Sequence, residues 1–376
     1  MKVVTIIGAR PQIIKASSIS RAIRNHHSKT LDEVIVHTGQ HYDANMSDIF
    51  FSELDIPQPK YNLAVGSGSH GEQTSRMIEA IERVLIAEQP KAIILYGDTN
   101  STLAGAVAAS KIHVPIVHIE AGLRSFDKAM PEEINRVMCD HASTLLFSPT
   151  KAGYNNLLKE GFSPQISKRP TSNQPNLYHS GDIMYDNTIY FLQKATSLRY
   201  SQDMPDQDFI LCTIHRNNNT DNKERMDAIL RSLCALSHKM TVVLPLHPRT
   251  RKMLPLMLGK DTLQRLQGEH DIRIIDPVSF LEMTKMENQA KLIITDSGGV
   301  QKEAYFLKKP CIILRPQTEW IEIVEQGNAA IVDADYDKII AQSEFYLTNA
   351  PQDYPNIFGD GRAAEFACRQ IFDCLA

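Results

Sequence analysis

The sequence has no long apolar run. None approaches the roughly 18 to 20 residues that a membrane-spanning helix needs, and the apolar run before Gly8 is too short for the core of a signal peptide. Its six cysteines contain no C-x-x-C pair, which argues against both a disulfide framework and a structural zinc site. We therefore expect a cytoplasmic protein with reduced thiols.

The sequence also has no large excess of positive or negative charge. The 40 Lys and Arg residues against 44 Asp and Glu residues give a net charge of −4, which argues against a general binder of nucleic acid or of anionic membranes. A local basic pocket remains possible. The hydrophobic fraction of 43% and the charged fraction of 22% are typical of a globular protein with a large core. The length of 376 residues predicts about two to three domains.

Several common site motifs are missing. The chain has no P-loop, and it has no G-x-S-x-G elbow of a serine hydrolase. Its histidines and acids show no compact metal-ligand spacing. We expect an enzyme without a bound metal or cofactor.

What the sequence does contain is an alternation of short β-branched runs with helical stretches. The expected strands are 3–7, 34–37, 92–96, 116–119 and 144–147, and then 209–214, 241–246, 272–275, 292–295, 311–314 and 330–332. Buried strands separated by helices predict parallel α/β sheets. A polar, proline-containing stretch at 161–177 interrupts the alternation. The predicted fold is two Rossmann-like α/β domains facing a cleft: residues 1–170, joined by a C-terminal helix at 360–376, and residues 178–359.

Glycines and polar side chains follow several predicted strands, where open α/β sheets bind their ligands. Ser297, Gly298 and Gly299 precede a predicted helix, and the free amides of its first turn could bind a phosphate. An ordinary turn with Ser297 as helix cap is an equal alternative. Glu303 lies near the same helix end, where it could accept ribose hydroxyls or simply face solvent.

Two cations and two histidines also lie near strand ends. Arg10 and Lys15 flank the start of the first helix, which is unfavourable for positive charge and therefore favours an anionic ligand there. His215 and His247 each follow a strand of the second half. Each could be a base, a phosphate-binding cation or a satisfied polar group.

Three acids make up the candidate acid/base set. Asp98 and Glu120 end apolar strands, and Glu132 begins a predicted helix. Neighbouring strand ends could bring Asp98 and Glu120 together, as an acid/base pair requires. The alternative for Asp98 is a helix cap, but two acids in matching positions favour chemistry.

Taken together, these strings resemble one family over nearly the whole chain, the non-hydrolysing UDP-N-acetylglucosamine 2-epimerases. The matching strings are GARPQIIKA at 8–16, TGQH at 38–41, GDTNSTLAG at 97–105, HIEAGLRS at 118–125, PEEINR at 131–136, HR at 215–216 and TDSGGVQKEA at 295–304.

The resemblance implies a glycosyltransferase-B-like fold and a cytoplasmic homodimer that makes nucleotide-sugar precursors of surface polysaccharides. It implies that UDP leaves C-1 as the C-2 proton is removed, and returns to the resulting glycal with C-2 inverted. It implies catalysis by Asp98, Glu120, Glu132 and His215, with Arg136 close by; diphosphate binding by Ser297, Gly298 and Gly299; ribose binding by Glu303; and phosphate or sugar binding by Arg10 and Lys15.

The chain departs from the common family pattern at two informative places. GARPQ stands where members acting on UDP-N-acetylglucosamine commonly read GTRPE, and Trp320 replaces the arginine of the common TERPE string. With SFDKAMPEEINR, these strings look more like the branch that acts on UDP-2,3-diacetamido-2,3-dideoxyglucuronate, which is the alternative substrate.

Three other functions stay open. A retaining UDP-sugar glycosyltransferase would need an acceptor pocket and should not place three carboxylates around the donor sugar. A hydrolysing epimerase would release free UDP, and such chains usually carry a fused kinase domain. A UDP-sugar-binding regulator would keep the fold without turnover, and the intact Asp98, Glu120, Glu132 and His215 argue against it.

Overall fold

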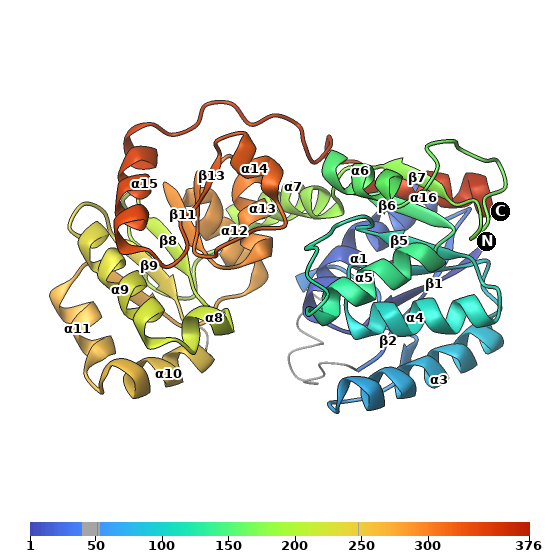
Figure 1. Ribbon diagram of the computed structural model, residues 1–376, viewed down its shortest axis with the longest axis horizontal. Coiled ribbons are helices and arrows are strands. Elements are labelled where there is room, and N and C mark those ends of the chain that lie inside the picture. The colour runs from blue at the N-terminus through green and yellow to red at the C-terminus, as the bar shows by residue number, and fades with distance from the viewer. Residues whose placement is uncertain (40–50, 52, 247) are drawn as a thin grey trace. The chain divides into compact units, whose positions relative to one another are not determined.

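The computed structural model of the protein describes residues 1–39, 51, 53–246 and 248–376 (Figure 1). Gln40, His41 and His247 of the sequence motifs lie outside the described residues. The chain divides into two units, the first made of residues 1–187 and 356–376 and the second of residues 188–355.

The first unit is built on a parallel sheet with the strand order β3-β2-β1-β4-β5-β6-β7. Its strands are β1 (Lys2–Ile7), β2 (Asp32–His37), β3 (Tyr61–Asn62), β4 (Ala92–Tyr96), β5 (Ile116–Ile119), β6 (Leu145–Ser148) and β7 (Asn176–His179). The five strands expected in this half are confirmed, whereas β3 and β7 were not expected. Strand β7 pairs with β6, so the polar stretch 161–177 lies inside the first unit, and the division between units follows it.

Helices pack against this sheet in two groups. The helices of the unit are α1 (Arg10–Ala22), the π-helix η1 (Ile23–His27), α3 (His70–Glu88), α4 (Asn100–Lys111), α5 (Pro131–Ala142), α6 (Lys151–Lys159) and α16 (Ala363–Leu375), while α7 (Ile183–Thr196) continues into the second unit. Helices α3, α4 and α5 pack in succession, and α1 packs on α16 (Figure 1). Val4 and Leu95 of the strands share a buried cluster with Met77 of α3 and Ala104 of α4.

The C-terminal helix is tied to the rest of the first unit by a half-buried acid. The Asp186 carboxylate accepts hydrogen bonds from the backbone amides of Ala363 and Ala364 at 3.1 and 2.8 Å. These are free amides of the first turn of α16, and a carboxylate there stabilises the helix start. Residues from the far end of the chain therefore complete the first unit.

The second unit has a parallel sheet with the order β10-β9-β8-β11-β12-β13. Its strands are β8 (Ile210–Thr213), β9 (Val242–Pro245), β10 (Ile272–Ile275), β11 (Leu292–Thr295), β12 (Cys311–Ile313) and β13 (Ala329–Ile331). Its helices are α8 (Asn217–Thr220), α9 (Lys223–Ser237), α10 (Pro248–Leu258), α11 (Thr262–Glu269), α12 (Phe280–Gln289), α13 (Gly298–Phe306), α14 (Ile321–Glu325) and α15 (Tyr336–Thr348). All six strands expected in this half are confirmed, and so is the α/β class of both domains.

Each sheet has one point where its strand order reverses. This point lies between β1 and β4 in the first unit and between β8 and β11 in the second. Open α/β sheets bind ligands beyond the carboxyl ends of the strands at such a point, because the loops diverge there and leave space. Gly8 and Gly97 follow β1 and β4, and His215 and Ser297 lie just beyond β8 and β11. These four residues therefore lie at the reversal points.

Two negative observations hold for the described part of the chain. No helix there is both long and apolar enough to cross a membrane. The cysteines are all free thiols, and Cys139, Cys212, Cys311 and Cys368 are buried.

Candidate active site

The loop after β1 is held by the side chain of Gln12. Its Oε1 accepts hydrogen bonds from the amides of Gly8 and Ala9 at 2.9 and 3.2 Å. Its Nε2 donates to the Tyr96 carbonyl and to Thr102 Oγ1, both at 3.0 Å. One neutral amide thus supplies acceptor and donor at once, which an ionised carboxylate cannot do. The Gln of GARPQ joins the loops after β1 and β4.

Lys15 and Glu120 form the first ion pair of the site. Lys15 Nζ lies 2.7 Å from Glu120 Oε1, and their side chains are only 14% and 10% exposed. Glu120 follows β5 with a φ of 74°, a left-handed conformation that costs energy in a residue with a side chain. A Cβ added to Gly97 would lie 3.1 Å from Lys15 Nζ and 3.6 Å from Glu120 Oε1, so the pair lies over the turn before Asp98. Arg10, the first residue of α1, is exposed.

Asp98 belongs to a second charged group. Its carboxylate pairs with Arg136 of α5, whose other guanidinium nitrogen, Nη1, lies 2.6 Å from Glu133 Oε2. The Asp98 carbonyl accepts a hydrogen bond from Asn135 Nδ2 at 2.9 Å. The Asp98 side chain is 28% exposed, whereas Arg136 is buried at 6%. Asp98 is therefore fixed at both its backbone and its carboxylate and still reaches solvent.

The two adjacent glutamates of PEEINR differ sharply. Glu132 is exposed on the first turn of α5. Glu133 is buried, and its carboxylate accepts from the backbone amides of Ser125 and Phe126 at 2.9 and 3.1 Å in addition to pairing with Arg136. Glu133 thus shapes the loop before α5 and fixes Arg136. Glu132 is left open to bind a ligand.

In the second unit, a buried aspartate organises the loop after β8. Asp296 is fully buried, and its carboxylate accepts from the backbone amides of His215 and Arg216 and from Asn219 Nδ2 at 3.0 to 3.2 Å. His215 Nδ1 lies 3.4 Å from Asp296 Oδ1, and its side chain is 44% exposed. Asp296 therefore holds the backbone of His215, which presents its imidazole to solvent.

The residues after β11 form an open helix start. Ser297 caps α13, since its Oγ accepts from the Val300 amide at 3.4 Å. A Cβ added to Gly298 or Gly299 would find no heavy atom closer than 3.6 or 3.8 Å. A ligand could therefore approach this backbone closely, and a helix N-terminus favours an anion. Glu303, further along α13, is half-buried.

Trp320 lies beside this helix start. It is 5% exposed, and its Nε1 donates to the Gly298 carbonyl at 3.0 Å, while Lys302 Nζ lies 4.1 Å from its ring centre. Although Trp320 replaces the arginine of the common TERPE string, another arginine lies near Gly298. A Cβ added to Gly298 would lie 3.7 Å from Arg315 Nη1. Arg315 binds Glu319 through two hydrogen bonds of 2.8 and 2.9 Å. Burial opposes the charge of Glu319, but Arg315 lowers the pKa of this carboxyl below its usual value.

Sequence reasoning missed a buried acid of the second unit. Glu287 of α12 is 1% exposed and is hydrogen-bonded to Glu303. Burial, the charge of Glu303 and this hydrogen bond raise the pKa of Glu287 well above its usual value. Glu287 therefore holds its proton more tightly than an ordinary glutamate, beside the Glu303 carboxyl. The sequence did not predict this contact, because the periodicity of a helix does not show which residue of another element a buried acid contacts.

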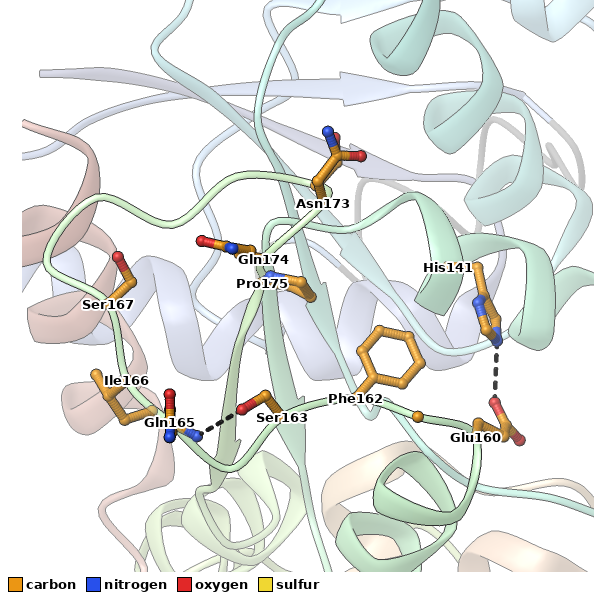
Figure 2. Close-up of a pocket in the computed structure, with 12 residues that line it drawn as sticks. His141, Glu160, Phe162, Ser163, Gln165, Ile166, Ser167, Asn173, Gln174 and Pro175 are labelled. Carbon is orange, nitrogen blue, oxygen red and sulfur yellow. Dashed lines mark hydrogen bonds and ion pairs between the residues drawn. The ribbon is translucent and has the colours of Figure 1, made fainter.

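A cavity of about 590 Å³ lies elsewhere in the first unit (Figure 2). One wall is formed by His141 and Phe162, whose rings are 4.9 Å apart, and by Glu160, which lies 3.1 Å from His141 Nε2. None of the candidate site residues lines this cavity. A large volume by itself does not locate the chemistry, and we place the site by its charged groups. Among the described residues, no three His, Cys, Asp or Glu side chains gather as a metal site would require.

Comparison with known proteins gives a consistent result. A family model described as UDP-N-acetylglucosamine 2-epimerase matches residues 22–372. The chain belongs to this family. It is 48% identical over 366 residues to the UDP-2,3-diacetamido-2,3-dideoxy-D-glucuronate 2-epimerase of Pseudomonas aeruginosa, covering 97% of each chain. It is 43% identical over 372 residues to the UDP-N-acetylglucosamine 2-epimerase of Methanocaldococcus jannaschii, again covering 97% of each.

Solved structures agree with this UDP-N-acetylglucosamine 2-epimerase family. The structure of the M. jannaschii enzyme in complex with UDP-GlcNAc and UDP superimposes with a TM-score of 0.83 at 42% identity, covering 99% of each chain. The glycosyltransferase-B-like fold and the family expected from the motifs are thereby confirmed, and the enzyme is an isomerase of the epimerase type.

Proposed function

We propose that the chain is a non-hydrolysing UDP-sugar 2-epimerase that inverts C-2 of a UDP-2-acetamido sugar. The observation that carries the proposal is the arrangement of two acids at adjacent strand ends. Asp98 follows β4 and is bound by Arg136, and Glu120 follows β5 and is bound by Lys15. Inversion of a C–H centre needs one group to accept a proton and another to deliver one, and two fixed carboxylates supply both roles.

The reaction type explains why such a pair is needed. The C-2 proton of an acetamido sugar is not acidic enough for direct removal near neutral pH. In the elimination route this proton passes to a carboxylate, its bonding electrons form a C-1=C-2 double bond, and UDP leaves C-1 with the electron pair of the broken C–O bond. UDP then adds back to the glycal while C-2 receives a proton on its opposite face. The route is redox-neutral and needs no nicotinamide.

The departing diphosphate must be stabilised and retained. In the proposal it binds Ser297 and the open amides of Gly298 and Gly299, where the helix start favours negative charge. Glu303 accepts the ribose hydroxyls, and His215 faces the phosphates. Retaining UDP until it adds back separates epimerisation from net hydrolysis.

The remaining proposed roles come from the family resemblance. Arg10 and Lys15 would add positive charge near the phosphates and the sugar, and Glu132 is proposed as the third catalytic carboxylate. The exposure of both Arg10 and Glu132 supports these roles, since each could reach a bound ligand.

Two sugars are candidates for the substrate. UDP-N-acetylglucosamine is the substrate in the name of the family. UDP-2,3-diacetamido-2,3-dideoxyglucuronate is favoured by the two departures from the common pattern, Gln12 and Trp320, and it is the substrate in the name of the Pseudomonas aeruginosa relative. The second sugar carries an additional acetamido group and a carboxylate, so it requires a different sugar pocket.

Proton NMR in D₂O tests the function and separates the two sugars. The purified protein would be incubated with each UDP-sugar in turn. Deuterium entering C-2 together with a new manno-configured UDP-sugar supports epimerisation, and the faster substrate identifies the branch. Accumulation of free UDP and glycal would indicate a hydrolytic enzyme instead. UDP binding without exchange on either sugar would overturn the proposal in favour of a glycosyltransferase or a binding protein.

We also propose, from the family resemblance, that the enzyme is a homodimer acting in the cytoplasm and that its product serves surface polysaccharide synthesis. Light scattering on the purified protein tests the dimer, since a monomer's mass would be close to the 42.3 kDa of one chain.

A further inference from the structure

A buried ion pair contacts the two loops of the first unit that carry Asp98 and Glu120. His118 of β5 and Asp140 of α5 are both fully buried, and His118 Nδ1 lies 2.6 Å from Asp140 Oδ1. The other ring nitrogen, Nε2, lies 2.8 Å from the carbonyl oxygen of Gly97. Gly97 immediately precedes Asp98, so the imidazole contacts the backbone turn that carries this acid.

The contacts of the ring define its protonation state. A carboxylate oxygen and a carbonyl oxygen are both acceptors, so each ring nitrogen of His118 must donate. A neutral imidazole has only one N–H, and the ring is therefore an imidazolium. Burial opposes this charge, but the neighbouring Cys139 and Asp140 raise the pKa of His118 well above its usual value.

The second oxygen of Asp140 reaches the other carboxylate loop. Asp140 Oδ2 accepts from the Gly122 amide at 3.1 Å and lies 2.7 Å from Arg124 Nη1. Gly122 comes two residues after Glu120. One carboxylate therefore joins two loops, holding the turn of Glu120 directly and the turn of Asp98 through His118.

The charges of this cluster are balanced within the fold. Arg124 binds Glu160 at 2.6 and 2.7 Å in addition to Asp140, so two cations face two carboxylates. The Arg124 side chain is 2% exposed. Removing one partner from such a set leaves an uncompensated buried charge, and the remaining groups must then shift or admit water. The cluster is rigid only when complete.

We propose that the Asp140–His118 pair is a positioning device that sets the turns of Asp98 and Glu120 for proton transfer at C-2. The inference rests on the proposed epimerase function. His118 and Asp140 are positioning residues in this scheme, because they contact the loops and not the substrate. Proton transfer is sensitive to such positioning, since a misplacement of about 1 Å in a catalytic group can cost roughly 100-fold in rate.

Two substitutions at one position separate positioning from simple stability. In His118→Asn the side-chain amide can take the place of Nδ1–H and keep the bond to Asp140, but it is too short to reach the Gly97 carbonyl. In His118→Gln the longer amide can take the place of Nε2–H and keep the bond to Gly97. We expect kcat to fall about 100-fold in His118→Asn and about tenfold or less in His118→Gln, with KM within about threefold of wild type in both.

A matched control carries the same type of change away from the site. Asp186→Asn alters a half-buried carboxylate that also holds two backbone amides, those of Ala363 and Ala364. We expect Asp140→Asn to lower both Tm and kcat, whereas Asp186→Asn changes Tm and leaves kcat at the wild-type value. Nitrogen-15 NMR of labelled histidine, assigned by the signal lost in His118→Asn, should show both ring nitrogens protonated near neutral pH.

The outcomes distinguish this inference from the proposed function. Absence of C-2 exchange in the wild-type protein would overturn the proposed function itself. Wild-type exchange with equal kcat in His118→Asn and His118→Gln would overturn the positioning role. So would a kcat that follows Tm across all variants, including Asp186→Asn, or a His118 ring with one unprotonated nitrogen.

Discussion

Arg136 binds two carboxylates, and replacing each of them in turn gives the sharpest test of the acid/base assignment. Asp98→Asn keeps the size of the side chain and removes its ability to take up a proton. Loss of a general acid or base typically lowers the rate by about 10² to 10⁴-fold, which corresponds to roughly 3 to 5 kcal/mol in the activation barrier. We expect kcat to fall within this range while UDP binding is retained.

The structural cost of the same change is small. The Asp98 carboxylate is 28% exposed, and Arg136 keeps its 2.6 Å contact with Glu133. The asparagine oxygen can still accept a hydrogen bond from Arg136, so the change removes a charge and keeps one hydrogen bond. Asp98→Asn should therefore lower the Tm only slightly, and its loss of activity cannot be attributed to unfolding.

Glu133→Gln is the matched control. Glu133 is 3% exposed and accepts from two backbone amides as well as Arg136. The glutamine NH₂ group would face a donor where the carboxylate offered an acceptor, which costs about 2 to 4 kcal/mol. The two variants should therefore differ in opposite ways. Glu133→Gln should lose more stability than Asp98→Asn, and Asp98→Asn should lose more kcat than Glu133→Gln. C-2 deuterium exchange and thermal denaturation measure the two effects. Near-wild-type exchange in Asp98→Asn would refute the assignment.

Three further predictions concern the backbone approach, packing and pH. Gly299→Ala should fold normally, because its Cβ would meet nothing closer than 3.8 Å, but lower UDP affinity in calorimetry at least about tenfold if a phosphate approaches this backbone closely; unchanged affinity would contradict that approach. Gly8→Ala should lower the Tm, because its Cβ would lie 2.1 Å from Ser101 Oγ and overpacking costs about 1 to 3 kcal/mol. The control Gly71→Ala in α3 places a Cβ with no atom within 4 Å and should be neutral or stabilising. Equal Tm changes in the two variants would argue against tight packing at Gly8. Because the folded pKa of Glu287 is raised, its contribution to stability is complete below the unfolded pKa and is lost as the pH rises towards the folded value. Glu287→Gln should therefore gain in Tm relative to wild type as the pH is raised above the ordinary carboxyl range; a Tm difference that does not change with pH would contradict the raised pKa.

Much of the fold is visible in the sequence because strands and helices leave local patterns. The eleven expected strands were found by their short β-branched runs, and all are present in the two sheets. Strand β3 has only two residues, Tyr61–Asn62, and β7 follows a polar stretch, so neither has a local pattern that predicts it. Each is an edge strand that exists because a neighbouring strand offers free backbone groups.

The sequence also determined the family and the kinds of residue at the site. The strings around Asp98, Glu120 and Ser297 identify the family because they match its motifs in order and spacing. A sequence shows order along the chain, however, and not distance across it.

Only the tertiary structure decided which of these residues meet. It paired Lys15 with Glu120, buried Glu133 while leaving Glu132 exposed, and placed Glu287 against Glu303. It also joined His118 to Asp140 beneath two loops. These contacts link residues of different strands and helices, and the fold brings them together because packing the sheets excludes water and forces each buried charge to find a partner.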